Sequence, residues 1–344
     1  MIEGVSVVIC TYNGSKRIAS VLDYLAKQRF EKAVNWEIIL VDNASEDNTV
    51  EVARNAWNSG TIPLHIIPEP KKGLSNARGA GIRESHYNLV CFIDDDNWVN
   101  PIYIERIFDI MKSNPGVALL GGQGEAVFEG EEPKWFHEFQ QAFAVGPQAK
   151  KDGIMIHKSS FLYGAGLTLR KDVWNRIIEK GFTFCLSDRT GTSITSGGDA
   201  EMCYAIRLAG YDLYYDSKLT FKHYMPAGRM SVPYFIKLAG SFGKATAITD
   251  IYDSVLNNNK GIERVKVQNY FLALLYSVYN ILLVLPAYFK NKLLKRDLIQ
   301  PQFEFTYSVE NLKQKLQLNR SYGNYVLSIK NAAWRNIHER LQVN

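Results

Sequence analysis

The chain has 344 residues, of which 46% are hydrophobic and 22% are charged, so global disorder is excluded and one large domain with an appendage, or two small domains, can form. The formal net charge of +5 is unevenly spread. Residues from Leu256 onward contain 13 of the 40 Lys and Arg but only 5 of the 35 Asp and Glu. Because this basic tail is also apolar, we expect an anionic lipid surface as its partner and no nucleic acid.

The first hundred residues alternate short apolar runs with segments of helical spacing. Strands are expected over residues 5–10, 37–42, 64–67 and 89–93. Helices are expected over 15–28 and 49–57 and from Gly73 onward. Strands that alternate with helices predict a parallel sheet with right-handed crossovers. No basic, apolar leader precedes the first strand, so no signal peptide is expected.

The middle of the chain is less regular. A helix is expected from Pro101 to residue 112, a strand over 117–120 before a Gly-rich stretch, and a strand over 161–170. A helix over 172–180, a loop over 182–198, a helix over 200–209 and a strand over 211–215 follow. We therefore predict an α/β domain over residues 1–230 and a helical extension over 231–344.

Residues 270–289 form an uncharged segment of about 20 residues, which is long enough to cross a bilayer. Basic residues flank it on both sides, among them Lys266 and Lys290. Three interpretations remain open: a helix in the membrane interface, a spanning helix, and a buried or oligomer-forming helix. We expect residues 262–296 to contact the membrane surface.

Acidic residues stand where the expected strands end. Asp42 closes the second strand, although Asp is also a common turn residue. Asp94, Asp95 and Asp96 close the fourth strand, and three adjacent carboxylates repel one another unless a cation lies between them. Oxygen ligands suit Mg²⁺ or Mn²⁺, so Asp94 and Asp96 are candidate metal ligands, while Asp95 is expected to point elsewhere. The alternative is a solvated acidic turn.

A further acidic cluster, Asp199-Ala-Glu201, opens the helix after the Gly-rich loop. Asp199 either caps this helix, with Glu201 in the first turn, or acts as a catalytic base at the mouth of a cleft. Arg78 follows the turn at Gly73 and could hold an anion together with the backbone of that helix start. Spacing alone leaves both alternatives for Asp199 open.

Taken together, these segments resemble family 2 glycosyltransferases, which have the GT-A fold. The resemblance covers residues 5 to about 229 and rests on five pieces in the family's order. They are VSVVICTYNG, EIILVDNASEDNT, KKGLSNARGAG, FIDDDNW and GGDAEMCYAIRLAGYDLYYD, followed by Lys222-His223. No single piece decides the matter. Gly198 stands where many members carry an acid, so one supporting charge is missing.

The resemblance implies roles for particular residues of this chain. Asp199 matches the family's catalytic base, and Asp42 would hydrogen-bond the nucleotide base. The other nucleotide-sugar contacts would come from Thr11, Tyr12, Arg78, Asp94, Asp95 and Arg229. The metal ligands would be Asp94, Asp96 and His223. Residues 187–189 are expected to border the acceptor site. Trp98, Trp135 and Phe136 either stack on sugar rings or belong to the core.

The activity implied is inverting, metal-dependent transfer of a hexosyl or N-acetylhexosaminyl group from a nucleotide diphosphate, by default a UDP-sugar. The expected cofactor is Mn²⁺ or Mg²⁺, and the acceptor is a saccharide or a lipid-linked saccharide. Cell-surface polysaccharide synthesis at the cytoplasmic side of the membrane would fit. The alternative is a non-catalytic nucleotide-sugar-binding protein of the same fold. No GxGxxG motif follows the first strand, which argues against a dinucleotide enzyme.

Overall fold

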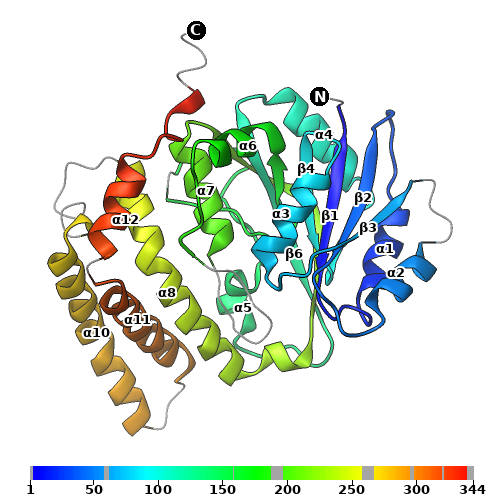
Figure 1. Ribbon diagram of the computed structural model, residues 1–344. Coiled ribbons are helices and arrows are strands. Elements are labelled where there is room, and N and C mark those ends of the chain that lie inside the picture. The colour runs from blue at the N-terminus through cyan, green and yellow to red at the C-terminus, as the bar shows by residue number, and fades with distance from the viewer. Residues whose placement is uncertain are drawn as a thin grey trace.

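The computed structural model describes residues 3–57, 62–157, 159–186, 197–257, 267–294, 298–319 and 321–338. A mixed sheet with strand order β3-β2-β1-β4-β8-β6-β9-β5 forms its centre, and β7 pairs with β9 (Figure 1). The strands are β1 Val5–Thr11, β2 Trp36–Asp42, β3 Leu64–Pro68, β4 Leu89–Asp94, β5 Asn97–Val99, β6 Val117–Phe128, β7 Gly153–Ile154, β8 Thr168–Arg170 and β9 Asp212–Met225.

Helices cover both faces of this sheet. Those within the first 230 residues are α1 Ile18–Ala26, α2 Thr49–Ala56, α3 Leu74–Glu84, α4 Tyr103–Ser113, α5 Phe136–Phe139, α6 Lys171–Glu179 and α7 Gly198–Leu208, with 3₁₀ turns η1 Gln140–Phe143 and η2 Ala227–Met230. The later helices are α8 Val232–Leu256, α10 Tyr270–Leu293, α11 Ile299–Leu318 and α12 Ser321–Lys330. This mixed sheet flanked by helices, with a helical C-terminal region, confirms the expected fold class.

The parallel half of the sheet follows from its apolar runs. β1, β2 and β4 are buried on both faces, as expected for strands covered by crossover helices. One face packs against α1, α2 and α4, where Ile18, Leu22 and Ile104 are fully buried. The other face packs against α3, α6 and α7. Register places Thr11 beside Asp42 and Cys10 beside Asp94, so the polar ends of these strands share one edge.

Two strands differ from the prediction. The strand expected over 117–120 continues to Phe128 as β6, because the glycines that follow it allow close approach rather than a turn. A Cβ on Gly122 would lie 1.9 Å from the carbonyl oxygen of Leu219 on β9, and one on Gly124 would lie 2.2 Å from that of Ala144. The strand expected over 161–170 is reduced to β8, which lies antiparallel to β4 and β6.

The helices after residue 230 share a hydrophobic core with the sheet. Ile248 of α8, Ala273 of α10 and Tyr322 of α12 belong to the same buried cluster as Val8 of β1. Figure 1 shows α8, α10, α11 and α12 stacked on one side of the sheet. The start of α7 touches this layer through Gly197, whose φ of 116° favours glycine and whose added Cβ would lie 2.8 Å from that of Ala245.

A buried polar network joins three of these helices. The Lys315 side chain is only 2% exposed, and its Nζ donates to Ser277 Oγ at 3.1 Å and lies 3.7 Å from Asp250 Oδ2. Ser277 Oγ donates to Asn311 Oδ1 at 2.9 Å, and Asn311 Nδ2 donates to the carbonyl oxygen of Gly243 at 3.1 Å. Because each polar group has a partner, the network fixes how α8, α10 and α11 pack.

We predict that Asp250→Ala lowers the free energy of unfolding by about 3 kcal/mol, because it leaves the Lys315 ammonium buried without its counterion. Asp250 is itself 33% exposed, and solvent screening places the value at the low end for such pairs. The double variant Asp250→Ala with Lys315→Met should recover most of the loss. Denaturant unfolding measures both, and an unchanged midpoint in the single variant would contradict the role of this pair.

Candidate active site

One cleft of about 820 Å³ opens at the C-terminal edge of the parallel strands. It brings together side chains from β1, α3, the end of β4, α7, β9 and η2. The predicted site residues that line it are Thr11, Tyr12, Arg78, Asp94, Asp95, Asp96, Asp199, His223 and Arg229. Segments far apart in the chain therefore converge, as expected for an open α/β sheet that binds its ligand at strand ends.

Asp42 is the predicted residue that does not line this cleft. Its Oδ1 accepts a hydrogen bond from the backbone N–H of Ser45 at 3.2 Å, which is an ordinary turn contact. The next residue, Asn43, lines the cleft instead. Asn43 Oδ1 accepts from the N–H of Gly73 at 2.7 Å, and its Nδ2 donates to the carbonyl oxygen of Lys71 at 2.8 Å. Asn43 thus shapes the turn that precedes α3.

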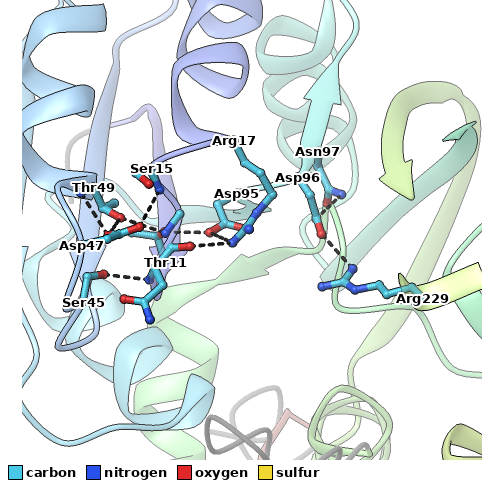
Figure 2. Close-up of polar contacts among 12 residues, drawn as sticks. Thr11, Ser15, Arg17, Ser45, Asp47, Thr49, Asp95, Asp96, Asn97 and Arg229 are labelled. Atoms are coloured by element: carbon cyan, nitrogen blue, oxygen red, sulfur yellow. Dashed lines mark hydrogen bonds and ion pairs between the residues drawn. The ribbon is translucent and has the colours of Figure 1, made fainter. Parts of the chain in front are cut away.

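Asp95 is held by two residues of the first strand–helix connection. Arg17 donates to both of its carboxylate oxygens, from Nε at 3.1 Å and from Nη2 at 2.9 Å (Figure 2). The Thr11 hydroxyl donates to Asp95 Oδ2 at 2.7 Å. Burial raises the pKa of the Asp95 carboxyl, and the hydrogen bonds from Arg17 and Thr11 oppose that rise. Sequence analysis missed Arg17, although it follows β1 at the same edge as Thr11.

Asp96 contacts a different set of basic side chains. Arg229 Nη1 donates to Asp96 Oδ2 at 2.9 Å (Figure 2). On the other side, His223 Nε2 lies 3.5 Å from Asp96 Oδ1. His223 Nδ1 is 2.9 Å from the carbonyl oxygen of Phe143, so its Nε2 is the atom directed at Asp96. Burial opposes ionisation of Asp96, but His223 and Arg229 outweigh it and hold the pKa of this carboxyl well below its ordinary value.

The Asp96–His223 pair fits the chemistry of Mn²⁺ or Mg²⁺. One carboxylate oxygen and one imidazole nitrogen face the same space, and Asp94 lines the same cleft. Within the ranges that the structure describes, no group of three or more His, Cys, Asp or Glu converges on one point. A divalent cation would therefore need further ligands from a bound phosphate, which is how Mg²⁺ is usually held.

Asp199 does not cap its helix. Gly197 occupies the N-cap position of α7, and Asp199 is the second residue inside the first turn. Its Oδ2 accepts from the backbone N–H of Gly164 at 2.9 Å, and its Oδ1 accepts from that of Ala200 at 2.9 Å. The carboxylate is thus held at the cleft wall while it remains half-buried. The capping interpretation is wrong, because glycine starts the helix.

Gly164 connects Asp199 to Arg78. Its carbonyl oxygen accepts from Arg78 Nη2 at 3.4 Å, and its N–H donates to Asp199. Arg78 is 7% exposed and its guanidinium lies 5.3 Å from the centre of the Phe92 ring. A Cβ on Gly164 would lie 2.6 Å from Arg78 Nη2, so this glycine leaves the space that the guanidinium fills. No pattern in the sequence marked Gly164.

Glu201, the second acid of the cluster, is structural. It is fully buried and accepts hydrogen bonds from the N–H groups of Cys185 and Leu186, at 2.7 and 2.9 Å. Its Oε1 also accepts from the Tyr252 hydroxyl at 2.7 Å. The carboxylate therefore ties α7 to the segment before residue 187 and to α8, while Asp199 faces the cleft.

Much of the remaining cleft surface is apolar and comes from α5, η1, α8 and α11. No sequence pattern marked these residues, among them Phe139, Phe143, Leu238, Phe242 and Phe303. The aromatic residues singled out from the sequence lie elsewhere. Trp135 and Phe136 pack in a core cluster with Phe235, and Trp98 stacks on Tyr24 with ring centres 5.5 Å apart. Residues 187–189 lie outside the described part of the chain.

Comparison with known families shows which family the chain belongs to. The sequence profile described as "Glycosyl transferase family 2" matches residues 6–177, half of the chain. The chain belongs to the family 2 glycosyltransferases. The acids of this glycosyltransferase at the end of β4 fall within the matched segment, whereas Asp199, His223 and Arg229 follow it.

Curated relatives cover only part of this glycosyltransferase. Chondroitin synthase of Escherichia coli is 29% identical over 123 residues, which are 35% of this chain and 17% of that protein. Glycosyltransferase AglE of Haloferax volcanii is 32% identical over 124 residues, which are 36% of this chain and 40% of that protein. The aligned segments thus span less than half of each relative.

Solved structures match over more of the chain. Staphylococcus aureus TarS 1–349 superposes with a TM-score of 0.54 at 14% identity, covering 92% of this chain and 91% of that one. The mannosyltransferase PcManGT from Pyrobaculum calidifontis, solved with GDP-Man and Mn²⁺, gives 0.55 at 15% identity, covering 92% and 88%. These similarities establish the GT-A fold of this glycosyltransferase.

We predict that Glu201→Ala lowers the free energy of unfolding by about 3 kcal/mol, because the buried Tyr252 hydroxyl and two partly buried backbone N–H groups lose their acceptor. The exposed Glu179→Ala, at the end of α6, serves as the matched control and should change stability by less than about 0.5 kcal/mol. Denaturant unfolding compares the two. Equal stability of both variants would contradict a structural role for Glu201.

Proposed function

We propose that this glycosyltransferase moves a sugar from a UDP-sugar, with UDP-GlcNAc as the first candidate, to a hydroxyl group of a saccharide or lipid-linked acceptor. The observation that carries the proposal is that Asp199 and the acids 94–96 line one cleft, although about 100 residues separate them. TarS has the same fold, and its structure with UDP-GlcNAc superposes on this chain with a TM-score of 0.51. TarS is named a β-N-acetylglucosaminyltransferase.

The donor would lie along the charged side of the cleft. Thr11 and Tyr12 at the end of β1 would line the nucleoside within the cleft. Asp42, which pairs with Thr11 at the end of β2 but does not itself line the cleft, would reach the base from its rim. Tyr12 sits beside Lys72, whose Nζ donates to its hydroxyl at 3.1 Å. Arg78, and Arg229 once it leaves Asp96, would neutralise the diphosphate, since guanidinium groups bind phosphate oxygens in pairs of hydrogen bonds.

A divalent cation, Mn²⁺ or Mg²⁺, would be held by Asp94, Asp96 and His223 together with the diphosphate of the donor. The cation would stabilise negative charge on the departing nucleoside diphosphate. The Asp96 carboxylate accepts a hydrogen bond from Arg229 Nη1 at 2.9 Å, and an ionised carboxylate is the form that binds a divalent cation. Mn²⁺ in the PcManGT structure is consistent with the same chemistry.

Asp199 would act as the general base. Its carboxylate is already fixed by two backbone N–H groups, so little reorganisation is needed when the acceptor binds. The acceptor oxygen would attack the anomeric carbon while its proton passes to Asp199, and the bond to the diphosphate oxygen breaks. Tyr163 lines the cleft nearby, and burial raises the pKa of its phenol, so it remains a hydrogen-bond donor.

A single displacement of this kind inverts the anomeric configuration. A retaining double displacement would need a second nucleophile placed against the sugar. Asp95 is engaged by Arg17, and Asp96 by Arg229. Burial raises the pKa of the Cys10 thiol to about 12, which keeps it protonated. The contacts of these groups favour inversion with Asp199 as the one base.

We also propose that the protein works at the cytoplasmic face of a membrane, in cell-surface polysaccharide synthesis, with residues 231–344 as its membrane-associated extension. The support is α10, 24 residues with a mean hydropathy of 1.8 over its most apolar window, of which only 11% is buried. It is the one described helix that is long and apolar enough to cross a bilayer. Its exposed side chains equally suit a helix lying in the interface.

We predict that Asp199→Asn lowers transfer by about 10²- to 10⁴-fold while UDP-GlcNAc affinity changes by less than about threefold, because the base acts only on the acceptor hydroxyl. Calorimetry gives the affinity. UDP release, with a lipid extract and synthetic glycosides as acceptors, gives the rate. Wild-type turnover in the variant would overturn the assignment. Tight UDP-GlcNAc binding without turnover of any donor in the wild type would favour a non-catalytic binding protein.

We predict that EDTA weakens UDP binding to the wild type by about tenfold or more, and that Asp96→Ala abolishes this dependence on the cation. Calorimetric titration with UDP in Mn²⁺ and in EDTA measures both. The exposed Asp23→Ala on α1 is the matched control and should respond to EDTA as the wild type does. An Asp96→Ala protein that still binds UDP more tightly in Mn²⁺ would refute the ligand role.

A further inference from the structure

An apolar groove of about 380 Å³ lies between α10 and α11. Leu283 and Val284 line it from α10, and Phe303 and Tyr307 line it from α11. Its volume falls within the range of small-molecule sites. None of the residue roles proposed above involves this groove.

Contacts on either side hold the groove in shape. Along α10 it lies between Ser277, which donates to Asn311 at 2.9 Å, and Tyr288, whose ring stacks on Phe305 with centres 4.8 Å apart. The two helices are therefore tied together at both sides of the groove. Because these contacts hold α10 and α11 together on both sides of the groove, the space between the two helices is retained.

The groove adjoins the active-site cleft at Phe303, which lines both. On the cleft side, Phe303 stacks on Phe139 and Phe235, with ring centres 5.8 and 4.8 Å apart. Leu238 and Phe242 of α8 extend this apolar surface along the cleft. Apolar side chains of α8 and α11 therefore line the cleft that holds Asp199 on the side where the groove adjoins it.

The outer surface of α10 has the character of a lipid-facing helix. Phe271, Leu275 and Leu282 are 73%, 65% and 59% exposed. Several exposed apolar side chains on one helix indicate an interaction surface, whereas single apolar residues scattered over a surface do not. Lys290 and Lys292 stand in its last turn. An apolar face that ends in cations suits the boundary between acyl chains and anionic head groups.

We propose that the groove between α10 and α11 binds the hydrocarbon chain of an amphiphilic acceptor, whose head group reaches Asp199 through the cleft. This inference rests on the proposed transferase function and names its acceptor class. The chain would pass from the membrane along α10 without crossing water. Leu283 belongs to both surfaces, since it lines the groove and is 59% exposed.

The polar residues of the groove show which part of the acceptor it holds. Glu304 lines it and accepts a hydrogen bond from Gln300 Nε2 at 3.1 Å. Its carboxylate would repel an anionic head group, whereas it can remain at the rim beside a hydrocarbon chain. The guanidinium groups of Arg17 and Arg229 lie in the cleft. The charge distribution therefore assigns the chain to the groove and the polar head to the cleft.

The test uses the full-length protein and a hexadecyl phosphate that carries a diazirine on its chain, presented in phosphatidylcholine vesicles. After irradiation, peptide mass spectrometry should place the label on residues 280–284 and 303–308. Leu283→Glu should reduce labelling of these peptides about fivefold or more, because a carboxylate disfavours a hydrocarbon neighbour. Leu293→Glu, on a residue that is 83% exposed and outside the groove, is the matched control and should retain wild-type labelling.

Calorimetry with UDP should show unchanged affinity for both variants, which establishes that they fold. Label spread evenly over α10, and lowered equally by both substitutions, would overturn the proposal in favour of simple membrane contact. Absence of label together with a stable dimer in sedimentation would overturn it in favour of a second copy covering α10. Labelling requires no turnover, so it should persist in Asp199→Asn, and failure of the transferase proposal would be seen separately.

Discussion

The structure depends on how three adjacent carboxylates are kept at the end of β4. Asp95 and Asp96 could not remain packed in a cleft without counter-charges, and cations from distant segments supply them. Arg17, which follows β1, pairs with Asp95, whereas His223 of β9 and Arg229 of η2 pair with Asp96. This pairing brings the segment after the first strand to the same end of β4 as β9 and η2, which follow the matched region. Under the proposed function, Arg229 is the partner of Asp96 that a cation and a diphosphate would replace.

The C-terminal helices complete the site as well as extending the chain. α8 packs on α7 through the contact of Gly197 with Ala245, and through the Tyr252 hydroxyl that reaches Glu201. The same helix lines the cleft with Leu238 and Phe242. The apolar side of the cleft is therefore built from the part of the chain that carries the exposed apolar helix. This arrangement supports the proposal of a membrane-bound acceptor.

Much of the fold and the acidic part of the site could be predicted from the sequence, because buried strands and the charges at their ends leave local patterns. Asp94 to Asp96 were found in this way, whereas the role of Asp199 was indicated only by the family resemblance. Contacts made across the fold leave no such pattern. Nothing local marks Gly164 as the partner of Asp199 and Arg78, and the strand was expected to end before the glycines of β6, although they allow close strand packing. Phe303 enters the cleft only through the packing of α11 on α8.

We propose that one cleft holds the cation, the diphosphate and the base, and a crystal structure with UDP and Mn²⁺ would test this most directly. We expect Mn²⁺ bonded to Asp96 and to the diphosphate, and Arg229 moved from Asp96 to a phosphate oxygen. Asp199 should face the open space beside the β-phosphate. A diphosphate bound outside this cleft, or an Asp96–Arg229 pair left intact with UDP and Mn²⁺ bound, would contradict it.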